Sequence, residues 1–408
     1  MKVLVTGGAG FIGSNFVRFH LANSDDEVTI LDSLTYAGSR DTLADFIENP
    51  RISFVEGDIC DREKVTATME GHHLVVHFAA ESHVDRSIKG SERFITTNCV
   101  GTNLLCDVAA QMDVQRFVHI STDETYGSRT NGSFTENDKL EPSSPYAASK
   151  AASDLIALGH YTTHDLPVVI TRSSNNYGPF QFPEKLIPLF VTNLLDGSSV
   201  PLYGDGTNVR DWIHVADNCA AISNVLQSGE IGEIYNIGAG NEVSNLDLTK
   251  MLINLCQRDE SAITRVDDRP GHDFRYSVDS TKIRELGWAP QIDLQTGLEA
   301  TVRWYRDNET WWRPKTTKAQ WNYRPLSPRP ADTYLWYETL PGENSKQGTS
   351  EAFWDGHGHY LARCQPFSFT AWCSQCSSEQ HHQLLETDPK TSQFSWSPAW
   401  WSGCYLRA

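Results

Sequence analysis

The sequence predicts an α/β protein built on a doubly wound parallel sheet. Short apolar runs rich in β-branched residues recur through the first half of the chain, and segments with a helical pattern separate them. A glycine-rich turn at Gly7, Gly10 and Gly13 follows the first of these runs. Strands that alternate with helices pair in parallel, which gives the fold class. A smaller C-terminal α/β domain and an irregular tail are expected after the large sheet.

The first strand is predicted at residues 2–6, and it leads through the three glycines into a helix. Glycines at this spacing allow a tight turn, the close approach of a pyrophosphate to backbone N–H groups, and close packing of the helix on the strand. A second strand at 27–31 ends at Asp32. A carboxylate there can accept the hydroxyls of an adenosine ribose and repels a 2′-phosphate, which favours NAD over NADP. These features predict a Rossmann-type domain that binds a dinucleotide.

Three further strands are predicted at 52–56, 74–78 and 116–120, with helices at 62–69 and 98–109 between them. Small residues follow the fourth strand, and they let a flat cofactor lie against the backbone. The alternation of strand and helix therefore continues to the fifth strand, as a parallel sheet requires.

Two adjacent carboxylates, Asp123 and Glu124, follow the fifth strand. Ligands bind at the carboxyl ends of the strands in open α/β sheets, so an acidic pair there indicates a site. Neighbouring carboxylates in a partly closed site cannot both ionise freely, so one pKa should rise and leave a protonated acid. A turn or a helix cap at the end of the strand is the structural alternative for these residues.

Tyr146 and Lys150 lie one turn apart on a helix predicted at 147–159. A lysine in this position can lower the pKa of the tyrosine and hold ribose hydroxyls, so that the phenolate acts as a base. A tyrosine and a lysine at this spacing are by themselves more often a surface pair. The glycine turn, Asp32 and the Ser-Thr at the end of the fifth strand favour the catalytic interpretation.

The sequence resembles extended short-chain dehydrogenase/reductases that act on nucleotide sugars, and more closely the dTDP-glucose 4,6-dehydratases. The resemblance covers about residues 1–316. One departure is Ser33, where the family usually has a lysine. The motifs that carry the resemblance are residues 6–13, 32–38, 79–87, 122–124, 146–150, 174–179, 182–188, 210–215 and 269–276.

The resemblance implies an NAD-dependent lyase that converts dTDP-glucose to dTDP-4-dehydro-6-deoxy-glucose. The reaction oxidises C4, eliminates water across C5 and C6, and reduces C6, so NAD is regenerated and retained in each turnover. Tyr146, supported by Lys150, would take the proton of the 4-hydroxyl, with Thr122 bonded to the same oxygen. Glu124 would be the base at C5, and Asp123 the acid at the 6-hydroxyl.

The resemblance also implies the residues that bind the two ligands. Those expected at NAD are Gly7, Gly10, Phe11, Ile12, Gly13, Asp32, Ser33, Leu34, Thr35, Asp58, Ile59, Phe78, Ala79, Ala80, Ser82, Thr97, Tyr146, Lys150 and Asn176. Those expected at the nucleotide sugar are Ser82, Thr122, Asn175, Lys185, Leu186, Pro201, Leu202, Tyr203, Arg210, Asn245, Arg269, His272 and Tyr276. Arginines suit a diphosphate because their donors form a fork. No metal site is expected, because the histidines lack metal-ligand spacing with nearby carboxylates.

Other functions on the same scaffold stay open. A UDP-glucose 4,6-dehydratase would recognise a nucleotide that differs by a methyl group on the base and a hydroxyl on the ribose. A UDP-sugar 4-epimerase or a UDP-glucuronate decarboxylase would keep Tyr146 and Lys150, but an epimerase has no use for an acid and a base at C5 and C6. A dinucleotide-binding protein without catalysis would be expected to have lost Tyr146, Lys150 or the carboxylates, which are all present.

The amino-acid composition indicates which binding partners and which cellular compartment to expect for the protein. The net charge of −18 argues against nucleic acid or an anionic membrane as partner. Residues 1–320 use 10 Lys and 18 Arg against 44 Asp and Glu, which fits an ordinary acidic enzyme or a host that lives at high salt. No apolar run approaches the ~20 residues of a membrane span. Unpaired cysteines in these residues indicate a reducing compartment, so a cytoplasmic enzyme is expected, and the resemblance suggests a homodimer formed through helices 98–109 and 147–159.

Three regions are predicted: an NAD-binding domain at 1–172 to which later segments return, a mainly nucleotide-sugar-binding domain at 173–318, and a tail at 319–408. Residues 321–408 hold 7 of the 12 tryptophans, few aliphatics and no sustained period. The tail is therefore expected to be disordered, or to be sequence never selected to fold. Zinc is not predicted there, since a strong signal needs two close-spaced ligand pairs and the tail has one, among Cys364, Cys373, Cys376, His381, His382 and Cys404.

Overall fold

The computed structural model describes residues 1–319, 351–354 and 360–363. The chain divides into two units, Met1–Ser327 and Pro328–Ala408, and each is described by itself. In the first unit, seven parallel strands form one sheet in the order β10-β6-β5-β4-β1-β2-β3. Their bounds are β1 Lys2–Thr6, β2 Glu27–Asp32, β3 Ile52–Glu56, β4 Leu74–His77, β5 Arg116–Thr122, β6 Val168–Ser173 and β10 Ile234–Ile237.

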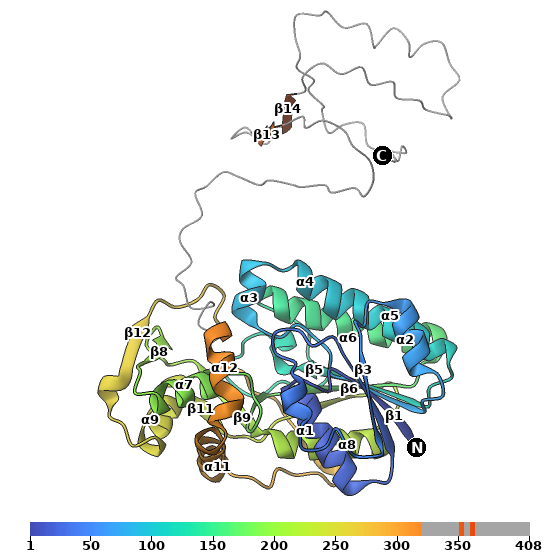
Figure 1. Cartoon of the computed structure of the whole chain (residues 1–408). Coiled ribbons are helices and arrows are strands. Elements are labelled where there is room, and N and C mark those ends of the chain that lie inside the picture. Colours follow the sequence, from blue (N-terminus) through green and yellow to red (C-terminus); the bar gives the residue numbers. More distant parts are fainter. Residues whose placement is uncertain (320–350, 355–359, 364–408) are drawn as a thin grey trace, which may run out of the picture. The chain divides into compact units, whose positions relative to one another are not determined.

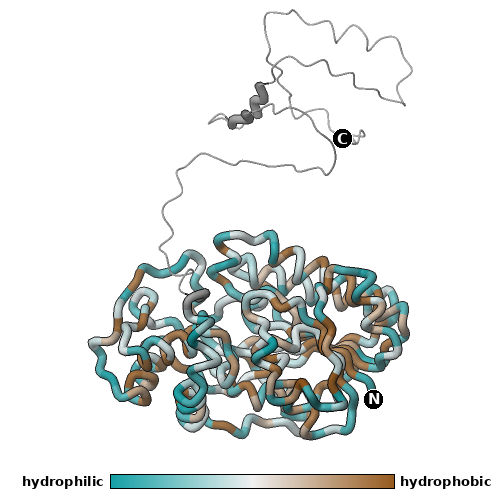
Figure 2. The backbone as a smooth tube through the Cα atoms, in the orientation of Figure 1, coloured by the Kyte–Doolittle hydropathy of each residue, from teal (hydrophilic) through white to brown (hydrophobic). Residues whose placement is uncertain are grey.

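Helices cover both faces of this sheet (Figure 1). Side chains alternate along each strand, so Val3 and Val5 of β1 enter one core while Leu4 enters the other. Apolar residues therefore run almost continuously along the central strands, as the brown segments of Figure 2 show. The first core includes α1 (Phe11–Asn23) and α8 (Val215–Ser228), and the second includes α2 (Arg62–Met69), α5 (Thr102–Gln111) and α6 (Pro145–His164).

The strand order places a crevice at the carboxyl ends of β1 and β4. From β1 the chain winds outward through β2 to β3, and it then returns to the other side of β1 with β4. The connections after β1 and β4 leave in opposite directions, and this is the point at which open α/β sheets bind ligands. The structure confirms the predicted fold class of a doubly wound, Rossmann-type parallel sheet.

The remaining elements of the first unit form a smaller α/β part around a separate apolar core. Two short sheets contribute to it, with orders β11-β9-β7 and β12-β8. Its main elements are β7 Asn175–Tyr177, α7 Leu186–Leu195, β8 Val200–Tyr203, β9 Val209–His214, β11 Glu242–Ser244, α9 Asn245–Leu255, β12 Ile263–Val266, α11 Leu294–Asp307 and α12 Glu309–Ala319. The boundary between residues 172 and 173 stays a prediction, and α8 and β10 are later segments that return to the large sheet.

The segment predicted as a helix at 98–109 begins differently. A π-helix at Ile95–Gly101 precedes α5, so the chain makes a wider turn before the regular helix. The side chain of Asn98 accepts a hydrogen bond from the Glu81 N–H (2.9 Å) and donates to the Glu81 carbonyl (3.0 Å). It also donates to Ser149 Oγ on α6 (2.8 Å). These contacts tie the loop after β4 to the N-terminal part of α6.

Asp154 of α6 and Arg172 of β6 form an ion pair inside the core. Both side chains are almost wholly buried, and Arg172 Nε lies 2.9 Å from Asp154 Oδ2. His119 of β5 adds a second contact, with Nε2 3.3 Å from Asp154 Oδ1. A buried charge without its partner costs free energy of folding, so the pair holds α6 in its position against β6.

Replacing Asp154 with alanine should destabilise the fold strongly, because Arg172 would keep a buried, unpaired charge. We expect the free energy of unfolding to fall by about 3–5 kcal/mol, measured by urea denaturation. Asp107→Ala is the control, because Asp107 pairs with Arg62 at the surface, where such pairs contribute about 1 kcal/mol or less. Equal losses in the two variants would contradict this account of the buried pair.

In the second unit, β13 (Glu351–Trp354) and β14 (Tyr360–Arg363) pair antiparallel. Apart from these strands and residue 319, the tail predicted at 319–408 lies outside the described residues, and so does its group of cysteines and histidines. Within the described part of the chain, no helix combines the length and the apolar character that crossing a membrane requires.

Candidate active site

A cavity of about 600 Å³ lies at the carboxyl ends of the strands around β1 and β4. We call it the cofactor cavity. Most of the residues expected at the dinucleotide line it. They are Gly7, Gly10, Phe11, Ile12, Gly13, Asp32, Ser33, Thr35, Asp58, Ile59, Phe78, Ala79, Ala80, Ser82, Thr97, Tyr146 and Lys150.

Two residues expected at the cofactor are placed elsewhere. Leu34 does not line the cavity, because its side chain packs against the core below β2. Its backbone N–H instead donates to Asp32 Oδ1 (2.8 Å), so it helps to fix the carboxylate. Asn176 lines the neighbouring cavity described below. A pattern of residues along the chain does not separate a side chain that faces a cavity from one that faces the core.

The glycine turn is shaped by close backbone contacts. Gly7 has a φ of +71°, and a Cβ added there would lie 2.5 Å from the backbone nitrogen of Ala79. A Cβ on Gly13 would lie 2.3 Å from the carbonyl oxygen of Gly7. No side chain caps the start of α1 after Gly10, so the first N–H groups of this helix face the cavity without a side-chain acceptor. The turn therefore has the form that binds a pyrophosphate.

Asp32 stands at the end of β2 with both carboxylate oxygens held by the backbone. Oδ2 accepts from the Ala9 N–H (2.9 Å), and Oδ1 accepts from the Leu34 N–H. Burial raises the pKa of Asp32, and these two hydrogen bonds oppose the rise. A fixed carboxylate on the cavity wall keeps lone pairs for ribose hydroxyls. The glycine turn and Asp32 together fit a dinucleotide whose ribose carries no 2′-phosphate.

A second cavity of about 150 Å³ lies next to the first, and Gln181, Glu184 and Lys185 line both. We call it the substrate cavity. Eleven of the thirteen residues expected at the nucleotide sugar line it, while Ser82 lines the cofactor cavity and Thr122 lines neither. The eleven are Asn175, Lys185, Leu186, Pro201, Leu202, Tyr203, Arg210, Asn245, Arg269, His272 and Tyr276.

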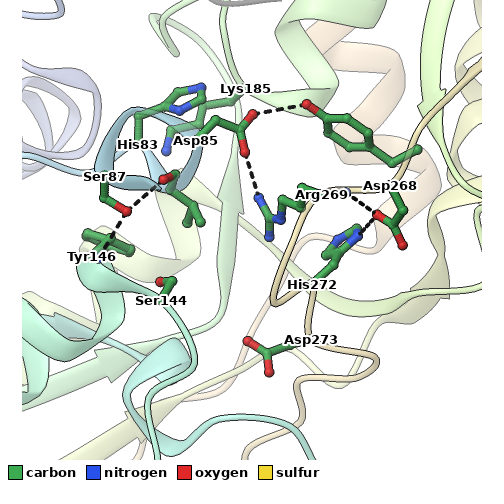
Figure 3. Close-up of polar contacts among 12 residues, drawn as sticks. His83, Asp85, Ser87, Ser144, Tyr146, Lys185, Asp268, Arg269, His272 and Asp273 are labelled. Atoms are coloured by element: carbon green, nitrogen blue, oxygen red, sulfur yellow. Dashed lines mark hydrogen bonds and ion pairs between the residues drawn. The ribbon is translucent and has the colours of Figure 1, made fainter. Parts of the chain in front are cut away.

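The charges of the substrate cavity come from both halves of the first unit (Figure 3). Asp85 accepts a hydrogen bond from the Tyr203 hydroxyl (3.1 Å), and its other oxygen lies 3.4 Å from Arg269 Nη1. His272 Nδ1 lies 2.6 Å from Asp268 Oδ1. Burial and the charge of Arg269 lower the pKa of His272 to about 4, so the ring is neutral near pH 7. The loop that carries Arg269 and His272 thus faces Asp85 across the cavity.

Three cationic side chains line this cavity: Lys185, Arg210 and Arg269. Arg210 lies over the ring of Tyr276, with its guanidinium carbon 4.1 Å from the ring centroid. Its Nη2 donates to the carbonyl of Asp273 (2.9 Å), which holds the 269–276 loop in place. Two arginines with forked donors, together with a lysine, suit a diphosphate.

Thr122, Asp123 and Glu124 form the turn after β5. The Thr122 hydroxyl accepts from the Glu124 N–H (3.3 Å) and donates to Asp123 Oδ1 (3.2 Å), so Thr122 caps the short helix that follows. The capping role that the sequence left open for the carboxylates therefore belongs to the threonine. Asp123 is 2% exposed and lines neither cavity, whereas Glu124 lines the substrate cavity.

The two carboxyl groups differ in how readily they ionise. Burial raises the pKa of Asp123 well above its usual range, and the nearby carboxylates of Glu124 and Asp211 raise it further. Asp123 Oδ2 has no hydrogen-bond partner among the described residues. Burial also raises the pKa of Glu124, but the charges of Arg269 and other cations of the cavity oppose this. Asp123 is thus the group held protonated, and Glu124 is the group that ionises more readily.

Tyr146 and Lys150 lie on the first turns of α6, on the wall of the cofactor cavity. The helix starts with Ser144 Oγ as its cap, and the Tyr146 N–H donates to Ser87 Oγ (3.1 Å), as Figure 3 shows. The ammonium of Lys150 donates to the backbone carbonyl of Ile120 (2.7 Å). Burial lowers the pKa of Lys150 to about 8.

The pKa of the Tyr146 phenol departs from the sequence-based expectation. The lysine was expected to lower it, yet burial raises it, and the charge of Glu124 adds to the rise. A hydrogen bond with the Thr122 side chain opposes the rise. The phenol is 8% exposed, and its desolvation outweighs the effect of a lysine whose ammonium bonds to a backbone carbonyl.

Several lining residues were not predicted from the sequence. In the motif at 182–188, only Lys185 and Leu186 were assigned to a ligand, although Glu184 lines both cavities. Glu184 could have been assigned from the sequence because it directly precedes Lys185, which was expected to bind the substrate. The other unassigned polar side chains on the two walls are Glu81, His83, Asp85, Glu92, Arg93, Thr96, Ser121 and Gln181. The described residues contain no group of three or more His, Cys, Asp or Glu side chains placed to hold a metal ion.

Comparison with known proteins places this site in a family. The family model described as GDP-mannose 4,6 dehydratase matches residues 4–301. A dTDP-glucose 4,6-dehydratase of Streptomyces niveus is 52% identical over 320 residues, which covers 77% of this chain and 95% of the relative. The chain belongs to the dTDP-glucose 4,6-dehydratase family.

Two further proteins are similar to this chain over most of their length. The low-salt glycan biosynthesis protein Agl12 of Haloferax volcanii is 55% identical over 305 residues, covering 75% of this chain and 98% of the relative. The crystal structure of DesIV, a dTDP-glucose 4,6-dehydratase of Streptomyces venezuelae with NAD bound, is 56% identical. It superposes with a TM-score of 0.76 and covers 77% of this chain and 99% of that one. The family resemblance expected from the sequence is confirmed.

Proposed function

We propose that this chain converts dTDP-glucose to dTDP-4-dehydro-6-deoxy-glucose as an NAD-dependent hydro-lyase. The observation that carries the proposal is the position of Asp123 and Glu124. The pair follows β5, with Tyr146 and the cofactor cavity on one side and the cations of the substrate cavity on the other. One carboxyl group is held protonated and the other is exposed to the substrate cavity, as an elimination requires.

NAD is the cofactor that fits the first cavity, and when bound it supplies the hydride acceptor for C4 and the hydride donor for C6. Gly7, Gly10 and Gly13 would hold its pyrophosphate at the start of α1. Asp32 would bind the hydroxyls of the adenosine ribose. Lys150, with its ammonium at the cavity wall, would bind the other ribose.

The residues of the site divide the proton transfers among them. Tyr146 accepts the proton of the 4-hydroxyl as a phenolate, a form that the positive charge of Lys150 and of bound NAD would favour against the effect of burial. The side chain of Thr122 also favours the phenolate. Oxidation at C4 makes the C5 proton acidic, and Glu124 removes it from the side of the substrate cavity. Asp123 donates a proton to the 6-hydroxyl, so the oxygen leaves as water. Because Asp123 lies behind the cavity wall, the sugar must reach in toward β5 for this step.

Glu124 is the residue that favours a dehydratase over an epimerase. An epimerase needs only Tyr146 to remove and return the proton of the 4-hydroxyl, whereas Glu124 places a carboxylate on the wall where C5 would lie. A UDP-glucose 4,6-dehydratase would use the same acid and base. The choice between a dTDP base and a UDP base is part of the proposal, and its support is the set of dTDP-glucose dehydratases to which the chain is similar.

Incubation with dTDP-glucose and UDP-glucose, in separate reactions, tests the proposal. The 4-keto product is followed by its absorbance in alkali, and the loss of water is measured by mass spectrometry. We expect water loss from dTDP-glucose at a rate well above that from UDP-glucose. Failure to lose water from either nucleotide sugar would contradict the dehydratase function, and a preference for UDP-glucose would contradict the proposed base.

The rate should depend on pH through Lys150 and Glu124. Lys150 has a pKa of about 8, so its positive charge is lost as the pH rises through about 8, and we expect kcat to fall there. Glu124 must be ionised to act as a base, so kcat should also fall at low pH, from a point above the usual pKa of a glutamate. Steady-state rates at saturating substrate measure both limbs. Lys150→Arg keeps its charge at high pH, and an unchanged alkaline limb in this variant would contradict the assignment.

A cytoplasmic homodimer completes the proposal. Ile95 and Val100 of the π-helix and Leu155 of α6 are about half exposed or more, at 49%, 52% and 61%. The π-helix and α6 pack against each other, so these apolar side chains belong to one helical region. Apolar side chains grouped in this way suit contact with a second copy. The acidic net charge supports the absence of nucleic acid among the partners.

A further inference from the structure

A buried carboxylate, Glu184, stands in the wall that separates the two cavities. It precedes α7, is 2% exposed and lines both the cofactor cavity and the substrate cavity. The proposed chemistry gives it no role. Because a buried carboxylate is costly unless it is paired, its partners show which parts of the fold it joins.

Side chains from two distant segments converge on Glu184. Arg86 of α3 (Val84–Lys89) directs Nε and Nη2 at Glu184 Oε2, at 3.1 and 3.0 Å. The side chain of Tyr36, which follows β2, lies near the same carboxylate. Burial raises the pKa of the phenol, and the charge of Glu184 raises it further, so the phenol is protonated. His83 Nε2 lies 3.9 Å away. One carboxylate therefore links segments that follow β2 and β4 to the segment that precedes α7.

The ring of Tyr36 adds a second set of contacts between these segments. The guanidinium carbon of Arg86 lies 3.6 Å from the centroid of the ring, which is a cation–π contact. The ring of Phe182 packs edge-on against Tyr36, with centroids 5.5 Å apart. Tyr36 is thus held between Arg86 and Phe182, near the carboxylate of Glu184.

These contacts join two segments of the wall of the cofactor cavity. Residues on both sides of Tyr36, namely Thr35 and Ala37, line the cavity together with Asp32. Phe182 and Glu184 line it from the other half of the first unit. The segment that would hold the adenosine ribose is therefore fastened directly to the segment that separates cofactor from substrate.

We propose that Tyr36, Arg86 and Glu184 form a clasp that retains the dinucleotide in the cofactor cavity between turnovers. This inference depends on the proposed function only in taking the dinucleotide to be NAD. A reaction that returns its hydride in every turnover has no need to release the cofactor, so a closed cavity does not slow it. The clasp is built from charge-assisted hydrogen bonds and a cation–π contact, and these must break before segments 33–38 and 181–185 can separate.

Exchange of bound NAD tests the clasp without using the dehydratase reaction. The holoenzyme is loaded with isotopically labelled NAD and chased with unlabelled NAD, and the label that remains on the protein is measured after gel filtration. In Tyr36→Ala we expect dissociation roughly tenfold faster, because the contacts of the ring with Arg86 and Phe182 are lost. Tyr36→Phe should show a smaller increase, since its ring still contacts Arg86 and Phe182.

Glu184→Gln is the second variant, and Arg40→Gln is the matched control. Arg40 lies just beyond the same segment, and its ion pair with Glu56 (3.1 Å) is exposed and makes no contact with the clasp. We expect faster exchange in Glu184→Gln and unchanged exchange in Arg40→Gln. Melting temperatures at saturating NAD show that each variant is folded.

The inference fails if Tyr36→Ala and Glu184→Gln exchange NAD at the wild-type rate, or if the wild-type protein itself exchanges NAD within one turnover. Its failure is separate from that of the proposed function. A wild-type protein that retains NAD but removes no water from dTDP-glucose would contradict the proposed function and leave the clasp intact. A protein that removes water yet exchanges NAD freely would contradict the clasp alone.

Discussion

Glu124→Gln should stop the reaction after C4 has been oxidised. The variant keeps the shape of the side chain but cannot accept the C5 proton, so we expect water elimination to slow by about 10²–10⁴. Nucleotide-sugar binding should stay near the wild-type level, because Arg210, Arg269 and Lys185 are unchanged. Mass spectrometry of the sugar would show little water loss, while reduced cofactor accumulates in a single turnover and is seen by its near-ultraviolet absorbance.

Asp123→Asn tests the proposed acid independently of the proposed base, Glu124. A sugar that carries fluorine in place of the 6-hydroxyl does not need a proton to release its leaving group. This substrate should restore elimination in Asp123→Asn but not in Glu124→Gln. Glu141→Gln, which alters an exposed carboxylate, is the control for a general loss of charge. Full dehydratase turnover in Glu124→Gln, or equal rescue of both variants by the fluorinated sugar, would show that the roles are wrongly assigned.

Tyr146→Phe should block the reaction one step earlier. Without the phenol no group accepts the proton of the 4-hydroxyl, and we expect kcat to fall by about 10²–10⁴. Reduced cofactor should not accumulate, in contrast to Glu124→Gln, because C4 is never oxidised. The amount of bound NAD should stay close to wild type, since the glycine turn and Asp32 are intact. Single-turnover absorbance and NAD content are the measurements.

Tyr161→Phe is the matched control for this variant, because Tyr161 lies on the same helix and is 38% exposed. Its turnover should equal that of the wild-type protein. If Tyr146→Phe formed reduced cofactor at the wild-type rate, the proton would have another acceptor. Glu124, whose charge already affects the pKa of Tyr146, would then be the first candidate.

The sequence was most informative where function depends on local backbone geometry. Glycines at 7, 10 and 13 are needed for contacts within a few residues of the turn and with the neighbouring strand, so their spacing carries the information. Asp32 ends a strand whose apolar pattern is visible in the chain, and its oxygens bond to nearby N–H groups. The parallel pairing of the sheet follows from the same local alternation of strand and helix, whereas the strand order is known only from the structure.

The less accurate expectations concern what surrounds a side chain. Leu34 belongs to the cofactor motif, yet it packs into the core because the chain turns at that point with a positive φ of 50°. The pKa of Tyr146 rises because helix α6 is buried against the sheet, which the spacing of Tyr146 and Lys150 does not reveal. Glu184 was not assigned, because its partners Tyr36 and Arg86 lie about 150 and 98 residues away in the chain.

The sequence by itself determined the fold class, the family and the chemical types present at the end of β5, because these depend on local patterns and motifs. Only the tertiary structure decided how those groups behave. It buried Asp123 while it left Glu124 on the cavity wall beside cations, so the two carboxyl groups differ in how readily they ionise. It also closed Tyr36 against Glu184. Desolvation and pairing set the charge of a group, and both depend on residues that are distant in the chain.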